Sequence, residues 1–225
     1  MNSGCVRVVL CGACAVVAFA AGANAQVPWD NPSGSAGFFD WANGQNQTGL
    51  FGSPIIVGGD TFVFFPNAFE ASATDGATTM TSDTFEVDLI ASKGFRFTGI
   101  RIQELGTFAV SDGGSSDATG MVQIEDLASE RFVESALVTD PVLPATSGAG
   151  EWTGIAEVGL SGVVPFTLIH VSYSNDLLAI STPGGTSFIG LDVVGAPVAV
   201  TIVPAPAGLA LLLGLGAPGL IRRRR

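Results

Sequence analysis

The side chains that could carry out nucleophilic or acid–base chemistry are few in this sequence. His170 is the only histidine, and in the segment FTLIHVSYS it shares a strand face with Leu168 and Ser172 by alternation. A serine nucleophile needs a base beside it and usually a third group that orients the base, and no GxSxG segment is present. We therefore expect a structural role for His170 and predict no catalytic residue.

Carboxylates are numerous enough to raise two further kinds of chemistry. Glu86 and Asp88 project from one strand face, about 7 Å apart at ~3.3 Å per residue, and a glycosidase needs only two carboxylates. Solvated strand faces commonly carry such a pair. Asp112 and Asp117, in SDGGSSDATG, are the best calcium candidates because calcium takes oxygen ligands. Their spacing matches no EF-hand, so we expect no metal and no cofactor.

Tryptophans raise the possibility of carbohydrate binding. The candidates are Trp29, Trp41, Trp152 and also Tyr173. Their aromatic faces are flat and apolar, as needed to pack on sugar rings, and jelly-roll domains often bind glycans on exposed aromatic side chains. The alternative is that these tryptophans form the edges of the core, to which most of the 15 phenylalanines belong. Both interpretations stay open from the sequence.

The elements that would position these residues are strands. Phe85, Val87 and Leu89 alternate with polar residues, which predicts a half-buried strand. In GFRFTGIRIQE the alternation changes phase at Thr98 and Gly99, which predicts a β-bulge. The segments TFAV and MVQIE, on either side of the loop 111–120, predict a hairpin.

About ten short strands without a helical layer predict an all-β fold. We expect a single antiparallel β-sandwich, jelly-roll-like, over residues 26–202. Of nine basic residues, five lie in the two terminal segments, so this body has a net charge of 4 − 20 = −16. Such a charge repels phosphate groups, and we expect no nucleic-acid partner.

The first 25 residues have the pattern of a secretory signal peptide. Arg7 is followed by an apolar run to about Ala21, and the small residues Ala23 and Ala25 predict cleavage before Gln26. All three cysteines lie in this segment. The body would therefore contain no disulfide, and signal peptidase is an expected partner.

The last 23 residues begin with the motif Val203, Pro204, Ala205, Pro206, continue through an apolar stretch at 207–221 and end with Arg222, Arg223, Arg224 and Arg225. At ~1.5 Å per residue the apolar stretch spans ~22 Å, less than a ~30 Å hydrocarbon core. Cationic flanks stay cytoplasmic, which places the acidic body on the other side of the membrane. An ordinary tail anchor with a basic stop is the simpler alternative.

This order of features resembles the PEP-CTERM sorting signal of exported bacterial proteins, although alanine stands where that family has glutamate. The resemblance implies that residues 203–225 are a removable signal, cut by an exosortase-like membrane protease. It also implies a cell-surface or extracellular destination after transient attachment to the inner membrane. From the sequence we expect a noncatalytic surface or matrix protein; the alternative is a carbohydrate-binding module or carbohydrate-active enzyme whose partner is an extracellular polysaccharide.

Processing at both ends can be tested on one sample. We expect the mature protein from its native host to begin at Gln26 and to lack the terminal LIRRRR residues, because a short apolar segment followed by arginines is a poor permanent anchor. Intact-mass spectrometry with N-terminal sequencing measures both ends. Recovery of an intact C-terminus as the dominant species would indicate a permanent anchor.

Overall fold

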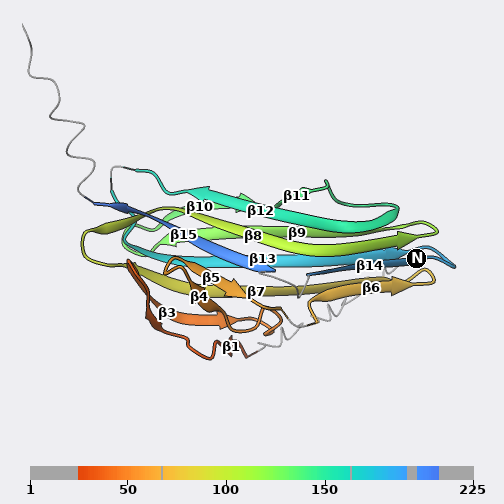
Figure 1. The fold of residues 1–225 in the computed structure, drawn as a ribbon, viewed down its shortest axis with the longest axis horizontal. Helices are drawn as coiled ribbons and strands as arrows, with labels where there is room; N and C mark the ends of the chain where they lie inside the picture. The colour runs from red at the N-terminus through yellow and green to blue at the C-terminus, as the bar shows by residue number, and fades with distance from the viewer. Residues whose placement is uncertain (1–24, 67, 163, 192–196, 208–225) are drawn as a thin grey trace, which may run out of the picture.

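In a computed structural model the chain folds into two antiparallel sheets packed face to face (Figure 1). The structure describes residues 25–66, 68–162, 164–191 and 197–207. Within these residues no helix is present, so none has the length and apolar character needed to cross a membrane. The predicted all-β sandwich is confirmed.

The first sheet has seven strands. In spatial order they are β1 (Val27–Pro28), β3 (Phe39–Asn46), β7 (Thr78–Ala91), β13 (Leu168–Ser181), β9 (Gly114–Asp126) and β10 (Arg131–Ala136), with β2 (Gly34–Ser35) also paired to β3.

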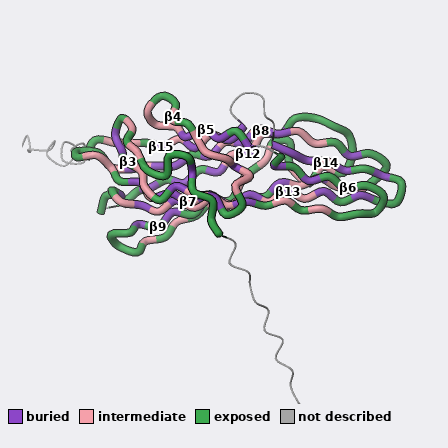
Figure 2. Tube along the Cα trace, turned by 90° about the horizontal axis from the view of Figure 1, so that it is seen from below, coloured by how far each residue is buried: buried purple, intermediate pink, exposed green. Residues whose placement is uncertain are grey.

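The second sheet has eight strands. Its main path is β11 (Val138–Asp140), β12 (Gly148–Gly159), β8 (Phe95–Ser111), β15 (Val198–Pro206), β5 (Thr61–Phe64) and β4 (Ile55–Val57), while β14 (Thr186–Leu191) pairs with β8 and with β6 (Glu70–Thr74). The molecule is elongated: β3, β4 and β5 lie at one end, and β6 and β14 lie at the other (Figures 1 and 2).

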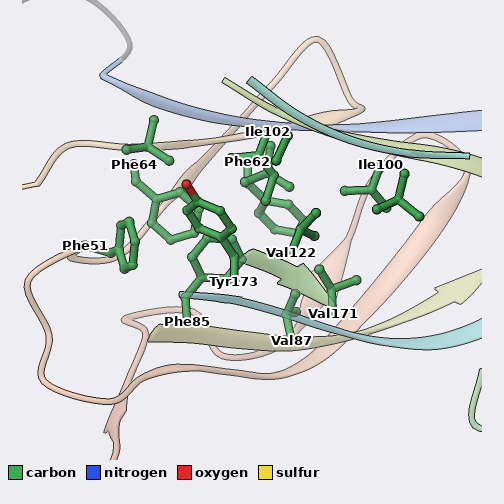
Figure 3. Packing of buried hydrophobic residues seen from close by; sticks show 14 of the residues in the cluster. Phe51, Phe62, Phe64, Phe85, Val87, Ile100, Ile102, Val122, Val171 and Tyr173 are labelled. Atoms are coloured by element: carbon green, nitrogen blue, oxygen red, sulfur yellow. The ribbon is translucent and has the colours of Figure 1, made fainter. Parts of the chain in front are cut away.

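The space between the sheets is filled by one hydrophobic cluster with members from both. Phe85, Val87 and Leu89 of β7 are buried, as their alternation predicts. At one end of the cluster aromatic rings pack together (Figure 3). Phe85 stacks on Phe64 with ring centroids 4.8 Å apart, and Phe51 meets Phe85 edge-on at 5.3 Å. Such geometries are the favourable ones for aromatic pairs.

The predicted bulge is present in β8. Val203 of β15 is opposite Gly99, whereas Pro204 is opposite Phe97, so Thr98 is the extra residue. The same pairing shows that β15 continues through the motif at 203–206. The expected boundary after residue 202 therefore falls inside a strand. Of the two terminal segments considered in the sequence, residues 1–24 and 208–225 lie outside the described residues.

The predicted hairpin at 111–120 is wrong. Only Asp112 and Gly113 form the turn, both with positive φ, and β9 begins at Gly114. The two strands then enter different sheets, because β8 pairs with β12 and β15 while β9 pairs with β13 and β10. Ser116 is buried and hydrogen-bonded to the hydroxyl of Ser187, which anchors the segment as a strand.

A buried carboxylate holds the turn after β9. Asp126 is 1% exposed and accepts hydrogen bonds from the backbone of Ala128, the hydroxyl of Ser129 and the guanidinium of Arg131. Burial acts to raise the pKa of this carboxyl, but the accepted bonds and the positive charge of Arg131 hold the pKa below its usual value of 3.8. Arg131 in turn lies over the ring of Phe166, 3.9 Å from its centroid.

Replacing this carboxylate should destabilise the protein. We expect Asp126→Asn to lower the free energy of unfolding at pH 7 by about 2 kcal/mol, because it weakens charge-assisted bonds to a buried group. Since the folded pKa is lowered, the difference from wild type should be present above pH 3.8 and shrink as the pH falls below it. Urea unfolding at pH 7 and at a pH below 3.8 measures the effect. Asp112→Asn, at an exposed turn, is the control; equal stability of the two variants at pH 7 would contradict the role of Asp126.

Candidate functional site

A cavity of about 380 Å³ opens between the two sheets at the end formed by β3, β4 and β5. None of the residues that line this cavity is charged. They are Trp29, Asn31, Ser33, Gly34, Trp41, Pro54, Ile55, Ile56 and Phe62. The volume lies in the range of small-ligand pockets, roughly 300 to 1,000 Å³, which are lined by apolar side chains with polar groups among them.

Trp41 is the half-buried aromatic side chain of this pocket. Its indole nitrogen donates to the carbonyl of Asn31 at 3.2 Å. Phe62 stands perpendicular to the ring, with centroids 5.6 Å apart. Gly34, opposite Trp41 in the β2–β3 pairing, contacts the ring so closely that an added Cβ would lie 2.3 Å from its Cζ2. These contacts fix the position of the indole.

Trp29 forms part of the same pocket from inside the core. It is 3% exposed, its indole nitrogen donates to the side chain of Asn46 at 3.1 Å, and its ring contacts Phe62 and Phe64. Its ring lies against Gly44 of β3, where an added Cβ would be 2.2 Å away. Trp29 therefore supports the pocket, while Trp41 is the more accessible ring.

Trp152 lies elsewhere and is 1% exposed. It stands on β12 opposite Gly106 of β8, and its indole covers the space that the missing side chain leaves. A ring buried in this way presents no face to a ligand. Tyr173 is likewise fully buried.

His170 lies on the outer face of the first sheet, in a cleft of about 510 Å³. Its Nδ1 is 2.7 Å from a carboxylate oxygen of Asp88, and the other oxygen of Asp88 accepts from Asn43 at 2.7 Å. Neighbouring Glu86 accepts from the side-chain amides of Gln26 and Gln45. Within the described residues no hydroxyl is hydrogen-bonded to His170, so the nucleophile–base contact of a serine hydrolase is missing there.

The two calcium candidates are not brought together with other ligands. Asp112 is exposed at the β8–β9 turn, and Asp117 lies within β9 opposite Leu178. Across the part of the chain that the structure describes, no group of three or more histidine, cysteine, aspartate or glutamate residues is arranged to hold a metal ion.

The pocket around Trp41 was not predicted from the sequence, because nothing in the sequence places Asn31, Ser33 and Ile56 beside Trp41.

No family model and no curated protein matches the sequence. Among solved structures, the chain is similar to the CBM22-1–GH10 modules of the Clostridium thermocellum xylanase 10B complexed with xylohexaose, with 15% identity and a TM-score of 0.26 over 64% of this chain. The matched region spans 28% of the xylanase chain.

Two further structures cover more of the chain. The carbohydrate-binding module TmCBM61, complexed with β-1,4-galactotriose, matches at 8% identity and a TM-score of 0.23, over 80% of this chain and 100% of the module. The Stig cyclase Fisc from Fischerella sp. matches at 10% identity and a TM-score of 0.23, over 81% of this chain and 98% of the cyclase. Identities and TM-scores this low assign no function to the present chain.

The contact between Gly34 and Trp41 can be tested directly. We expect Gly34→Ala to displace the indole from its position, because the new methyl group would overlap the ring. Since Trp29 and Trp152 are almost fully buried, acrylamide quenching of tryptophan fluorescence reports mainly on Trp41 and should change. Gly159→Ala is the matched control, as an added Cβ there meets no atom within 4 Å. Identical quenching of both variants and wild type would rule out the contact.

Proposed function

We propose that the chain is an exported, noncatalytic protein whose β-sandwich binds a neutral carbohydrate in the pocket around Trp41. The observation that carries this proposal is the half-buried Trp41 ring, which lines a cavity and is held in place by Gly34, Phe62 and the Asn31 carbonyl. A fixed aromatic ring binds a sugar ring with little loss of side-chain freedom.

The charge distribution favours an uncharged ligand. The chain has 20 acidic residues and a net charge of −11, yet no charged side chain lines the pocket. Anionic ligands would be repelled by the surrounding protein, and a cationic ligand would find no counter-ion in the cavity. The Asn31 and Ser33 side chains are groups that can bond to sugar hydroxyls.

A role without catalysis fits the carboxylates that could have served a glycosidase. Asp88 and Glu86 are each hydrogen-bonded to other side chains on the outer face of the first sheet. The Trp41 pocket lies between the two sheets and contains no carboxylate. Hydrolysis of a sugar in that pocket would lack both the acid and the base. A surface protein without any ligand is the alternative that the binding experiment decides.

Export is part of the proposal and rests on the two terminal segments. Signal peptidase would act before Gln26, and an exosortase-like protease would act near the motif at 203–206. Most of both segments lies outside the described residues, so their support comes from the sequence pattern alone.

Binding should depend on Trp41. On an array of neutral oligosaccharides we expect the wild-type protein to bind a defined subset, and Trp41→Ala to weaken that binding by about tenfold or more, equivalent to about 1.4 kcal/mol. The matched control is Phe132→Ala, which removes an aromatic side chain that is 54% exposed on β10. Isothermal titration with the best array ligand gives the dissociation constants.

Two results would contradict the proposal. Absence of binding across a broad array would favour a surface protein without a carbohydrate ligand. Equal loss of binding in Trp41→Ala and Phe132→Ala would move the ligand away from this pocket.

A further inference from the structure

Three polar side chains meet in the core between the two sheets. Glu104 comes from β8, and Tyr173 and Asn175 come from β13; all three are 0% exposed. The side-chain amide of Asn175 donates a hydrogen bond to Oε2 of Glu104, which joins the sheets across the core. The Tyr173 ring packs against Phe51 and Phe85, so this polar group borders the aromatic end of the core (Figure 3).

If Glu104 is ionised, these three side chains have too few hydrogen-bond donors for their acceptors. Within the described residues, Oε1 of Glu104, Oδ1 of Asn175 and the Tyr173 hydroxyl have no partner that meets hydrogen-bond geometry. Two of these atoms could then only accept, and the tyrosine could donate to one of them. An acceptor would stay unsatisfied beside a full negative charge, in a region where both are unfavourable.

Among the residues that the structure describes, no positive charge compensates Glu104. Its neighbours on the adjoining strands are Gly154 of β12 and Val198 of β15. Within the described part of the chain, Tyr173 is the one titratable side chain across the core that acts on Glu104. Its own pKa is raised well above its ordinary value, first by burial and then by the negative charge of Glu104. The tyrosine therefore stays protonated and supplies no charge.

We propose that Glu104, Asn175 and Tyr173 form a proton-binding site between the two sheets, in which Glu104 is a neutral carboxylic acid in the folded protein. The bound proton converts one oxygen of Glu104 from an acceptor to a donor. Two O–H groups, from Glu104 and Tyr173, then face the acceptors that lacked a partner. Folding near neutral pH takes up this proton from solvent.

A metal ion fits the same atoms less well. The site has one carboxylate and two neutral oxygens, whereas calcium usually takes six to eight oxygen ligands and magnesium demands near-octahedral geometry. No cluster of three or more histidine, cysteine, aspartate or glutamate side chains exists among the described residues. A proton needs only the single carboxylate.

The proton makes stability depend on pH in a defined direction. Burial raises the pKa of Glu104 from 4.5 to about 7, against a smaller lowering by the neighbouring side chains of Asn175 and Tyr173. Because the folded pKa is the higher one, the contribution of the neutral acid is complete below pH 4.5 and is lost as the pH rises to about 7. Above that pH the folded protein contains a buried negative charge.

The test compares the full-length protein with Glu104→Gln, whose amide is neutral at every pH. We expect the folding equilibrium constant of the wild type, relative to this variant, to fall by about 150-fold between pH 4.5 and pH 8.5. Glu151→Gln, at an exposed position of β12, is the matched control and should keep the wild-type pH profile. A profile of Glu104→Gln parallel to that of the wild type would overturn the proposal.

A second measurement does not depend on the variant folding. Infrared spectra of the wild type should show the carbonyl stretch of a protonated carboxylic acid at pH 6, and this band should vanish by pH 8.5. Absence of the band at pH 6 would overturn the proposal. So would stabilisation of the wild type by added calcium that is lost in Glu104→Gln, because a metal ion would then occupy the site.

Discussion

Two sheets can pack face to face only if side chains from both fill the space between them, and the rest of this structure depends on how that space is filled. Sheets stack at roughly 10 Å, and at the end formed by β3, β4 and β5 this separation is filled mainly by aromatic rings. Phe51, Phe64 and Phe85 pack against one another, and Trp29 continues the cluster toward the edge. The pocket that contains Trp41 lies at this end, and Trp29 and Phe62 belong both to the cluster and to the pocket lining.

Glycines determine where the largest rings can lie. Three of them, Gly34, Gly44 and Gly106, lie directly against the indoles of Trp41, Trp29 and Trp152 respectively. A methyl group at any of the three would overlap its indole, so each tryptophan depends on a residue without a side chain. The same arrangement explains why only one of the tryptophans faces a cavity as a half-buried ring: Gly34 belongs to the short strand β2 at the edge, whereas Gly106 lies in the middle of a sheet.

The sequence predicts local features of this fold better than distant ones. Alternation at Phe85, Val87 and Leu89, and the phase change at Thr98, are properties of a single strand, and both agree with the structure. The hairpin prediction at 111–120 failed because a tight turn has the same residue pattern in the sequence whether its two strands pair with each other or enter different sheets. Burial of Trp152 depends on Gly106, 46 positions away along the chain, and on the strand pairing that joins them. For the site, the residue types suggested Trp41, but its neighbours come from segments whose proximity only the closed sandwich creates.

The last strand also has a mechanical consequence. β15 is antiparallel to β8 on one side and to β5 on the other, and ends at Pro206. A force on the chain beyond this point pulls β15 along its own axis, while the inter-strand hydrogen bonds run perpendicular to it. The strand is then loaded in shear, so those bonds bear the force together instead of unzipping one after another. Pro204 and Pro206 have no N–H to contribute, so slippage begins at the outer end, and resistance rises once the load reaches the segment 198–201, which is held between two strands.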